Sequence, residues 1–292
     1  MTPAELITTA LKLSIILLVF ALGLRTELSE LGYLLRRPGQ LVRSLVAMNL
    51  IMPLFAAVLI SVLDLPVPVK VVLVCLSLAP VPPILPNKQV KAGGHASYAV
   101  SLLCAAAAFS ILSIPLTLEL LERVFRVPLD IAAVSVAKIV LITVLLPLLA
   151  GIAVRAMLAN VAERIAKPIS MAATVVLLLG LVAILIAFWR AIAAELTFPV
   201  ILAICAFIVF GLVAGHLLGG PDPSDRTVLA LSTASRHPGV ALAIASANFD
   251  EKKSLIALLL LYLLAGAVLS KFYLMARKPA AMPPRSAAPG PA

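Results

Sequence analysis

The sequence predicts an all-α polytopic membrane protein with about nine transmembrane helices, and two features carry this prediction. The composition is 63% hydrophobic and 12% charged, with a mean hydropathy of +1.16, whereas soluble domains are about 45–50% apolar and about 25% charged. The apolar residues also form continuous runs of about 20 residues, which is the length that an α-helix needs to cross the hydrocarbon core. A β-barrel would show short alternating strands instead.

Each apolar run then gives one element, in chain order. We expect spans at 5–24, 42–63, 69–90, 95–121, 130–154, 168–189, 198–219, 227–249 and 254–276. The first run lacks a basic n-region, and no A-x-A site precedes a polar mature domain, so we interpret it as a span and not as a cleaved signal. The spans form a single transmembrane domain over residues 1–277, and the tail 278–292, rich in Pro, Ala and Ser, is expected to be disordered.

The basic residues account for the net charge of +10 and orient the chain. They gather in alternate short loops and in the tail, and the main ones are Arg25, Arg36, Arg37, Arg43, Lys88, Lys91, Arg155, Arg164, Lys167, Lys271, Arg277, Lys278 and Arg285. The positive-inside rule then places the N-terminus outside and the C-terminus in the cytoplasm, as in a multi-pass protein of the plasma (inner) membrane. The expected surroundings are therefore the lipid bilayer and not nucleic acid. The oligomeric state stays open.

Two of the spans carry proline and polar residues at mid-membrane depth. The first break contains Pro80, Pro82, Pro83, Pro86 and Asn87, and the second contains Ser232, Ser235, Arg236, His237, Pro238 and Gly239. Broken helices leave backbone groups without water to bond, and transporters tolerate them where the broken ends line a substrate cavity. One broken span is third from the start and the other is second from the end, and they run in opposite directions. This placement predicts an inverted-topology repeat whose breaks meet near the midplane.

The polar residues of the breaks are the candidate substrate-binding residues. Arg236 has two interpretations: it attracts an organic anion or stands in for a sodium ion, or it is a structural residue that bonds loose carbonyls at the break. His237 and His95 titrate near neutrality and suit a proton-coupled carrier, although each is also consistent with a neutral histidine satisfied by the backbone. Asn87, Ser232 and Ser235 are neutral polar candidates, and the prolines with Gly239 shape the breaks.

Several segments resemble the bile acid:sodium symporter superfamily. Residues 21–24 and 35–38 resemble its "GMGL…rhP" signature, and residues 50–53 resemble its "F-x-I-M-P". Residues 79–80 and 91–94 resemble "C-P-G-G-T-A-S-N…A-K/R-G", and residues 239–249 resemble "G-L-A-x-A-L-A…H-F". The resemblance implies a core domain that rocks against a panel domain. The panel would contain the spans near 5–24, 130–154 and 168–189, and the core would contain the others.

The chain departs from the family pattern at the positions that the resemblance assigns to sodium ligands. The family Glu falls on Ser232, its Gln on Arg236 and its Asn on His237. The Ser-Asn of the other break falls near residues 85–86, or on Asn87 with a shift of one, and two further amides fall on His95 and near Met48. Sodium, like other hard cations, requires several oxygen ligands. We therefore expect the usual two-sodium arrangement, and any other metal site, to be absent.

These observations favour a secondary carrier of a small organic anion that works by alternating access, with a proton or no coupling ion and no cofactor. The alternative is a sodium-coupled symporter whose ligands are rebuilt from Asn87, Ser232 and backbone carbonyls. A channel, a ligand sensor and an intramembrane enzyme are weaker alternatives. No enzyme motif stands out, and the three cysteines have no ligand or disulfide spacing: Cys75, Cys104 and Cys205.

Overall fold

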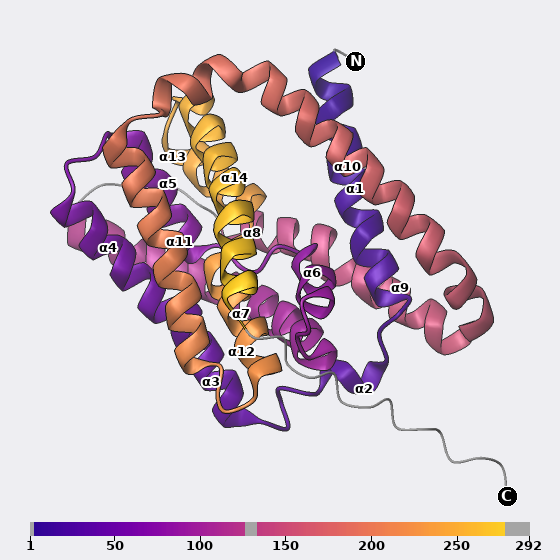
Figure 1. Cartoon of the computed structure of the whole chain (residues 1–292). Helices are drawn as coiled ribbons and strands as arrows, with labels where there is room; N and C mark the ends of the chain where they lie inside the picture. Colours follow the sequence, from indigo (N-terminus) through magenta and orange to yellow (C-terminus); the bar gives the residue numbers. More distant parts are fainter. Residues whose placement is uncertain (1–2, 126–132, 278–292) are drawn as a thin grey trace, which may run out of the picture.

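The computed structural model describes residues 3–125 and 133–277, and every regular element in these residues is helical (Figure 1). The helices are α1 (Pro3–Gly23), α2 (Leu28–Leu31), α3 (Pro38–Val46), α4 (Met52–Val62), α5 (Val67–Leu78), α6 (Leu85–Lys91), α7 (Ala96–Phe125), α8 (Ala133–Val140), α9 (Leu146–Met157), α10 (Ala159–Glu195), α11 (Phe198–Leu218), α12 (Pro223–Ala234), α13 (Pro238–Asn248) and α14 (Lys252–Ala276). Single π-helical turns, Ala47–Ile51 and Leu141–Leu145, join α3 to α4 and α8 to α9.

The helices confirm a multi-pass membrane protein. Within the described residues six helices are long and apolar enough to cross a bilayer: Pro38–Val62, Ala96–Glu119, Ala137–Met157, Ala159–Glu195, Phe198–Leu218 and Lys252–Ala276. Two shorter apolar helices, Thr9–Gly23 and Val67–Leu78, add to them. Every predicted run corresponds to a helix or a broken helix, but the number nine and the repeat symmetry stay predictions. The expected disordered tail lies outside the described residues.

Three helices pack together on one side of the molecule. α1 packs against both α9 and α10, and α9 packs against α10 (Figure 1). Two glycines permit the close crossing of α1 and α9: a Cβ on Gly23 would lie 2.3 Å from the Leu148 carbonyl oxygen, and one on Gly151 would lie 2.3 Å from the Phe20 carbonyl oxygen. These helices are those in which the sequence expected the panel, and the assignment of two mobile domains stays a prediction.

The remaining helices surround the two broken ones. α11 packs along α12 because a stripe of glycines faces it: a Cβ on Gly211 or Gly215 would lie within 3.0 Å of the α12 backbone. α14 contacts α11, α13 and α5. The main hydrophobic core runs through this group, and its buried members include Phe207, Leu231 and Tyr262. The broken helices are therefore enclosed by intact ones, as unpaired backbone in a membrane requires.

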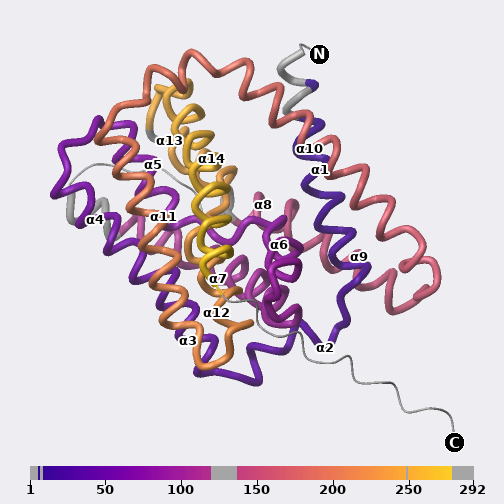
Figure 2. Tube along the Cα trace, viewed as in Figure 1, coloured from indigo at the N-terminus to yellow at the C-terminus, as the bar shows by residue number. Residues whose placement is uncertain are grey.

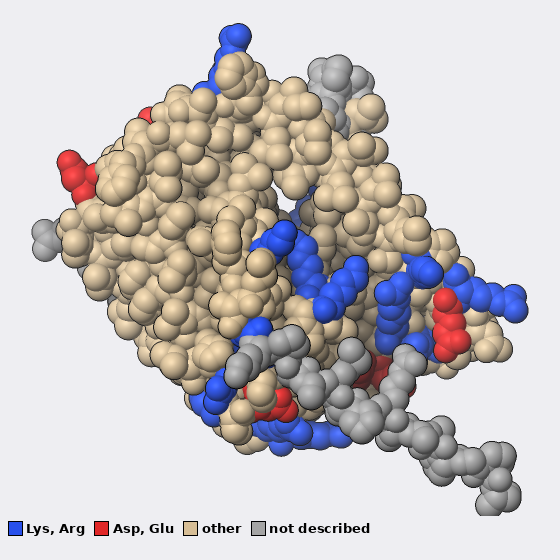
Figure 3. All heavy atoms as spheres, in the orientation of Figure 1, with Lys and Arg blue, Asp and Glu red and all other residues tan. Residues whose placement is uncertain are grey.

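One end of the molecule carries most of the positive charge, and we call it the basic end. The ends of α1, α6, α9 and α14 and the starts of α3, α10 and α12 lie there, and Figure 3 shows the Lys and Arg side chains gathered below a largely uncharged body. The Arg277 guanidinium donates to the Pro223 carbonyl at 2.7 Å, which ties the end of α14 to the start of α12. Figure 2 shows that α1 extends from this end towards the opposite end of the molecule.

Candidate functional site

The two broken helices cross, and their halves pair in opposite directions. α5 packs against α13, and α6 packs against α12. The chain leaves the helical path at Ala79–Ile84 in the first break and at Ser235–His237 in the second. The His237 backbone N–H donates to the Pro80 carbonyl at 2.8 Å and joins the breaks directly. The predicted meeting of the breaks is therefore observed in the structure.

Arg236 lies at this crossing with its side chain 1% exposed. Its Nη1 donates to the Ala79 carbonyl at 3.2 Å, and its Nη2 donates to the Met48 carbonyl. Ala79 ends α5, where the helix dipole favours a cation. The Nε–H is buried and has no hydrogen-bond partner among the described residues. The guanidinium thus bonds loose carbonyls, as one of its two interpretations expected, and keeps an unused donor.

The Met48 carbonyl is available because of the helix that contains it. Met48 lies in the π-helical turn Ala47–Ile51. Pro53, five residues later, has no N–H to donate in the π register. π turns of this kind recur at functional sites. The family resemblance places an amide side chain near Met48. In the structure the backbone carbonyl of Met48 supplies an oxygen at this position, and Arg236 donates to it.

Tyr262 on α14 holds the second break in shape, and the sequence analysis did not identify it. Its hydroxyl accepts a hydrogen bond from the Arg236 backbone N–H at 2.7 Å and donates to the Ala234 carbonyl at 2.7 Å. One hydroxyl therefore satisfies a donor and an acceptor that the break exposes. A signal existed: a single tyrosine within the aliphatic run 255–269 of α14 needs a partner for its hydroxyl.

The His237 ring caps α13 from inside the crossing. Its Nδ1 accepts from the backbone N–H groups of Gly239 at 3.1 Å and Val240 at 3.4 Å. Because Nδ1 is an acceptor, the neutral ring carries its proton on Nε2. The Nε2 atom is buried and has no partner in the described part of the chain. The adjacent residues Arg236 and His237 thus each keep one buried N–H donor without a partner among the described residues.

A glutamine that the sequence analysis missed joins the other halves. Gln89 on α6 is 0% exposed, and its Nε2 donates to Ser232 Oγ at 2.7 Å and to the Val228 carbonyl at 2.8 Å. Its Oε1 has no partner within the residues described. The candidate Ser232 is therefore engaged with α6 and buried. Gln89, and not the neighbouring candidate Asn87, makes the contact to α12.

The other predicted site residues are distributed around the crossing. Ser235 ends α12, and Pro238 begins α13 with Gly239 beside it. Pro86 lies in the first turn of α6 and not in the break. The residues that shape the first break are Pro80, Pro82 and Pro83. Asn87 is partly buried on α6. His95 lies away from the crossing, at the basic end: its Nδ1 accepts from the Tyr98 N–H at 3.4 Å. Its ring is tilted by 38° against the ring of Tyr33, with 4.8 Å between the ring centroids.

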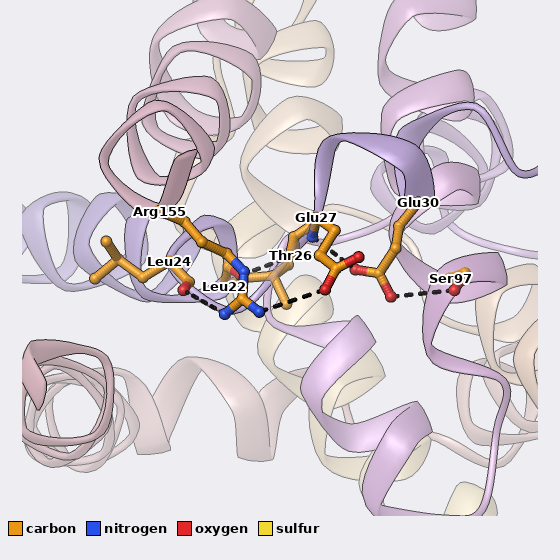
Figure 4. Close-up of polar contacts among 7 residues, drawn as sticks. All are labelled: Leu22, Leu24, Thr26, Glu27, Glu30, Ser97 and Arg155. Atoms are coloured by element: carbon orange, nitrogen blue, oxygen red, sulfur yellow. Dashed lines mark hydrogen bonds and ion pairs between the residues drawn. The ribbon is translucent and has the colours of Figure 1, made fainter. Parts of the chain in front are cut away.

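A polar bridge at the basic end joins the α1–α9–α10 group to α7 (Figure 4). Arg155 on α9 lies 3.6 Å from the Glu27 carboxylate, and its Nη1 donates to the Leu24 carbonyl at 3.4 Å. The Glu30 carboxylate accepts from the Glu27 N–H at 3.0 Å and from Ser97 Oγ on α7 at 3.1 Å. The short helix α2 is therefore the link between the two packing groups at this end.

The electrostatics of the crossing are dominated by one cation. Across the described residues no carboxylate forms an ion pair with Arg236, and no group of three or more His, Cys, Asp or Glu there is placed to hold a metal ion. The guanidinium is compensated only by carbonyl dipoles. An arrangement of this kind can accept an anion at the unused Arg236 and His237 donors.

Comparison with known proteins agrees with the geometry. The family model described as the Sodium Bile acid symporter family matches residues 12–195, which is more than half of the chain. No curated protein matches the chain. The matched region contains the first break and ends before α11, so Arg236 and His237 lie beyond it. Members of this family are transporters and not enzymes, and they carry organic solutes. The chain belongs to the sodium bile acid symporter family, and its membership implies a secondary transporter of that type.

Proposed function

We propose that the protein moves a small organic anion across the membrane by alternating access, with the substrate bound between the two breaks. The observation that carries this proposal is the buried Arg236 guanidinium. It donates to two carbonyl oxygens, and its own Nε–H has no partner among the described residues. A buried cation without a carboxylate costs on the order of several kcal/mol. An anionic substrate at the crossing would remove that cost.

The substrate site would combine charge with hydrogen bonds. Arg236 Nε–H and His237 Nε2–H would donate to the anionic group. Ser232, Ser235 and Asn87 would line the remainder, while His95 would face the route to the basic end. The Gln89 Oε1, a buried acceptor without a partner in the part of the chain that the structure describes, suits a donor group on the substrate.

The coupling would differ from the usual two-sodium arrangement of the family. The guanidinium bonds two main-chain carbonyls, the kind of oxygen that a bound cation would use, and its charge is fixed in the protein. We therefore propose a carrier that does not need sodium. The alternative is sodium bound by Asn87, Ser232 and the carbonyls of the break, since broken helices supply oxygen ligands without a side-chain signature.

The proposed architecture has nine spans, related by an inverted repeat and divided into a panel and a core. Support comes from the antiparallel pairing of α5 with α13 and of α6 with α12, and from the compact α1–α9–α10 group. The basic end would face the cytoplasm of a plasma (inner) membrane, with the N-terminus outside.

Uptake by proteoliposomes tests this proposal. A screen of small carboxylates and sulfated anions is run with sodium and proton gradients imposed separately. We expect uptake of at least one anion by the wild type, little change without sodium, and loss of uptake in Arg236→Ala and Arg236→Lys. Arg164→Ala, an exposed position on α10, is the matched control for loss of a positive charge.

Two results would count against the proposal. Wild-type uptake by a well-inserted Arg236→Ala protein would refute the anchoring role. A steep dependence on external sodium would instead support the sodium-coupled alternative.

A further inference from the structure

A second polar site lies at the basic end, between the start of α3 and the loop that enters α12. A cavity of about 340 Å³ opens there, and its charged and polar lining consists of Arg37, Gln40, Arg43, Asp222 and Asp225. The two guanidiniums and the two carboxylates balance formally. The cavity is separate from the crossing, which lies at the other end of α12.

Asp225 is the buried group of this cavity. Its side chain is 7% exposed, and its Oδ2 accepts a hydrogen bond from Gln40 Nε2 at 2.9 Å. Gln40 is equally buried, at 7%. The Asp225 Oδ1 is buried and has no partner among the residues that the structure describes. A carboxylate with one unsatisfied buried oxygen is costly, and Asp225 itself lines the cavity through which a donor could approach.

The charges around Asp225 argue against a cation as that donor. Arg37 and Arg43 line the same cavity from α3 and the residue before it and would repel a metal ion or an ammonium group. The same charges also disfavour a proton, and Arg37 lowers the pKa of Asp225, but a proton forms a covalent O–H bond with the carboxylate and needs no set of further ligands. Water in the cavity can accept a hydrogen bond from that O–H. The proton comes from hydronium in that water, and no other bond changes.

Groups from every neighbouring segment act on the pKa of Asp225. Burial raises the pKa of Asp225 above the usual range, and the charge of Asp222, in the loop before α12, raises it further. The hydrogen bond from Gln40 lowers this pKa, and so do the charges of His95, in the α6–α7 loop, and of Arg37. Tyr33, whose hydroxyl accepts from Arg37, also faces this cluster, and Asp225 helps to raise its pKa. On α7, Tyr98 shares a hydrogen bond with Ser44 beside it.

Protonation here would act on the crossing through α12. Asp225 lies in the first turn of α12, and Arg236 follows the end of the same helix, which is about 14 Å further along the axis because nine helical steps lead from Asp225 to Ala234. A neutral carboxyl accepts a weaker hydrogen bond than a carboxylate. A proton on Asp225 therefore weakens the Gln40 contact between α3 and α12.

His237 suits this task less well than Asp225. Its Nδ1 already accepts two backbone N–H groups at the start of α13, and a proton on that atom would displace both. The unused Nε2 already carries the proton of the neutral ring.

We propose that Asp225 is a proton-binding site of this transporter, loaded from the basic end, and that its protonation is coupled to movement of α12. This inference rests on the proposed function, because the coupled process is the transport of an anion. It assigns the coupling to a carboxyl and not to His95 or His237, the two histidines that the sequence offered as candidates for proton coupling.

The first test needs no substrate. The full-length protein in lipid bilayers is titrated while infrared spectroscopy records the carbonyl band of protonated carboxyl groups. We expect a titrating band in the wild type that disappears in Asp225→Asn and persists in Asp64→Asn, an exposed aspartate outside the cavity. Asparagine has nearly the size of aspartate and can still accept from Gln40, and thermal unfolding measurements check that the variant is folded.

Two further variants test the direction in which the midpoint pH of the Asp225 titration moves. Gln40→Leu removes a donor that favours the carboxylate, so the midpoint should rise, by about one pH unit for a hydrogen bond worth a tenfold change in the equilibrium. Asp222→Asn removes a like charge, so the midpoint should fall. A band unaffected by Asp225→Asn, or a midpoint that moves in neither direction, would overturn the proposal.

The second test separates this inference from the proposed function. Proteoliposomes that take up an anion are driven by a proton gradient, and anion exchange is measured without a gradient. Asp225→Asn should lose gradient-driven accumulation and retain exchange. Accumulation at the wild-type level in Asp225→Asn would refute the proton site while leaving the transporter intact. A chain that transports no anion would refute the proposed function and the coupling together, even if the carboxyl titrates.

Discussion

Replacing Tyr262 by phenylalanine isolates the contribution of a single hydroxyl to the crossing. The ring packs in the main core, so the substitution leaves the apolar contacts in place. It removes the acceptor for the Arg236 backbone N–H and the donor to the Ala234 carbonyl, both at 2.7 Å. Both backbone groups belong to a helix break, so no neighbouring turn can take them over.

The magnitude follows from the two orphaned groups. Interhelical hydrogen bonds in membrane proteins average about 0.6 kcal/mol in double-mutant cycles, with a maximum of about 1.7. A buried polar group left without a partner costs about 1–3 kcal/mol. Because Tyr262→Phe orphans two main-chain groups and adds no new contact, we expect a loss of about 2–4 kcal/mol in the free energy of unfolding.

Unfolding in mixed micelles of a mild and a denaturing detergent measures this loss. Tyr273→Phe is the matched control, because among the described residues its hydroxyl hydrogen-bonds with the His216 ring alone, at 2.8 Å and near the end of α11. The control should lose about 1 kcal/mol or less. If Tyr262→Phe were no less stable than Tyr273→Phe, the hydroxyl would not be holding the break, and the account of the crossing would be wrong.

Three further predictions concern the framework of the fold. Gly215→Val places a branched side chain where a Cβ alone would lie 2.5 Å from the Leu229 carbonyl oxygen. The free energy of unfolding should therefore fall by at least about 1–3 kcal/mol. In the control Gly39→Ala the added Cβ has nothing within 4 Å, and stability should change little. Glu27→Gln breaks a partly exposed ion pair with Arg155 and should cost about 0–1 kcal/mol; a larger loss would show that the bridge of Figure 4 holds the two groups together. The Ser224 N–H and hydroxyl lower the pKa of Asp222 below 3.8. The Asp222 carboxylate therefore stabilises the folded state above that pH, and this stabilisation is lost as the pH falls through the lowered pKa. Asp222→Ala should flatten the acid side of a stability–pH profile.

The positions of the breaks could be predicted from the sequence because proline imposes them locally. Pro80, Pro82 and Pro83 cannot donate the hydrogen bonds of a helix, and Pro238 can only begin one. The orientation charges predicted that the two broken spans run in opposite directions. The pairing of α5 with α13 then followed, since two antiparallel broken helices that meet at their breaks must pair in this way.

The partners at the crossing could not be predicted, because they depend on rotation and long-range contact. Asn87 and Gln89 are two residues apart and so point about 200° apart around α6; only packing decides which of them faces Ser232. His95 follows a turn at Gly93, whose φ of 80° redirects the chain, so it caps α7 and lies away from the break. The Met48 carbonyl became a partner only because α4 begins after a π turn.

A fixed charge and a mobile charge have different roles in such a carrier. Arg236 can make the crossing attractive to an anion, but its charge does not cross the membrane and so cannot drive accumulation. Moving one net negative charge against an inside-negative potential costs about 2.3 kcal/mol per 100 mV. One proton carried with each monovalent anion cancels that cost. A carrier anchored by Arg236 alone would therefore exchange anions down their gradients, whereas accumulation driven by a proton gradient requires a titratable group such as Asp225, which shares α12 with the break.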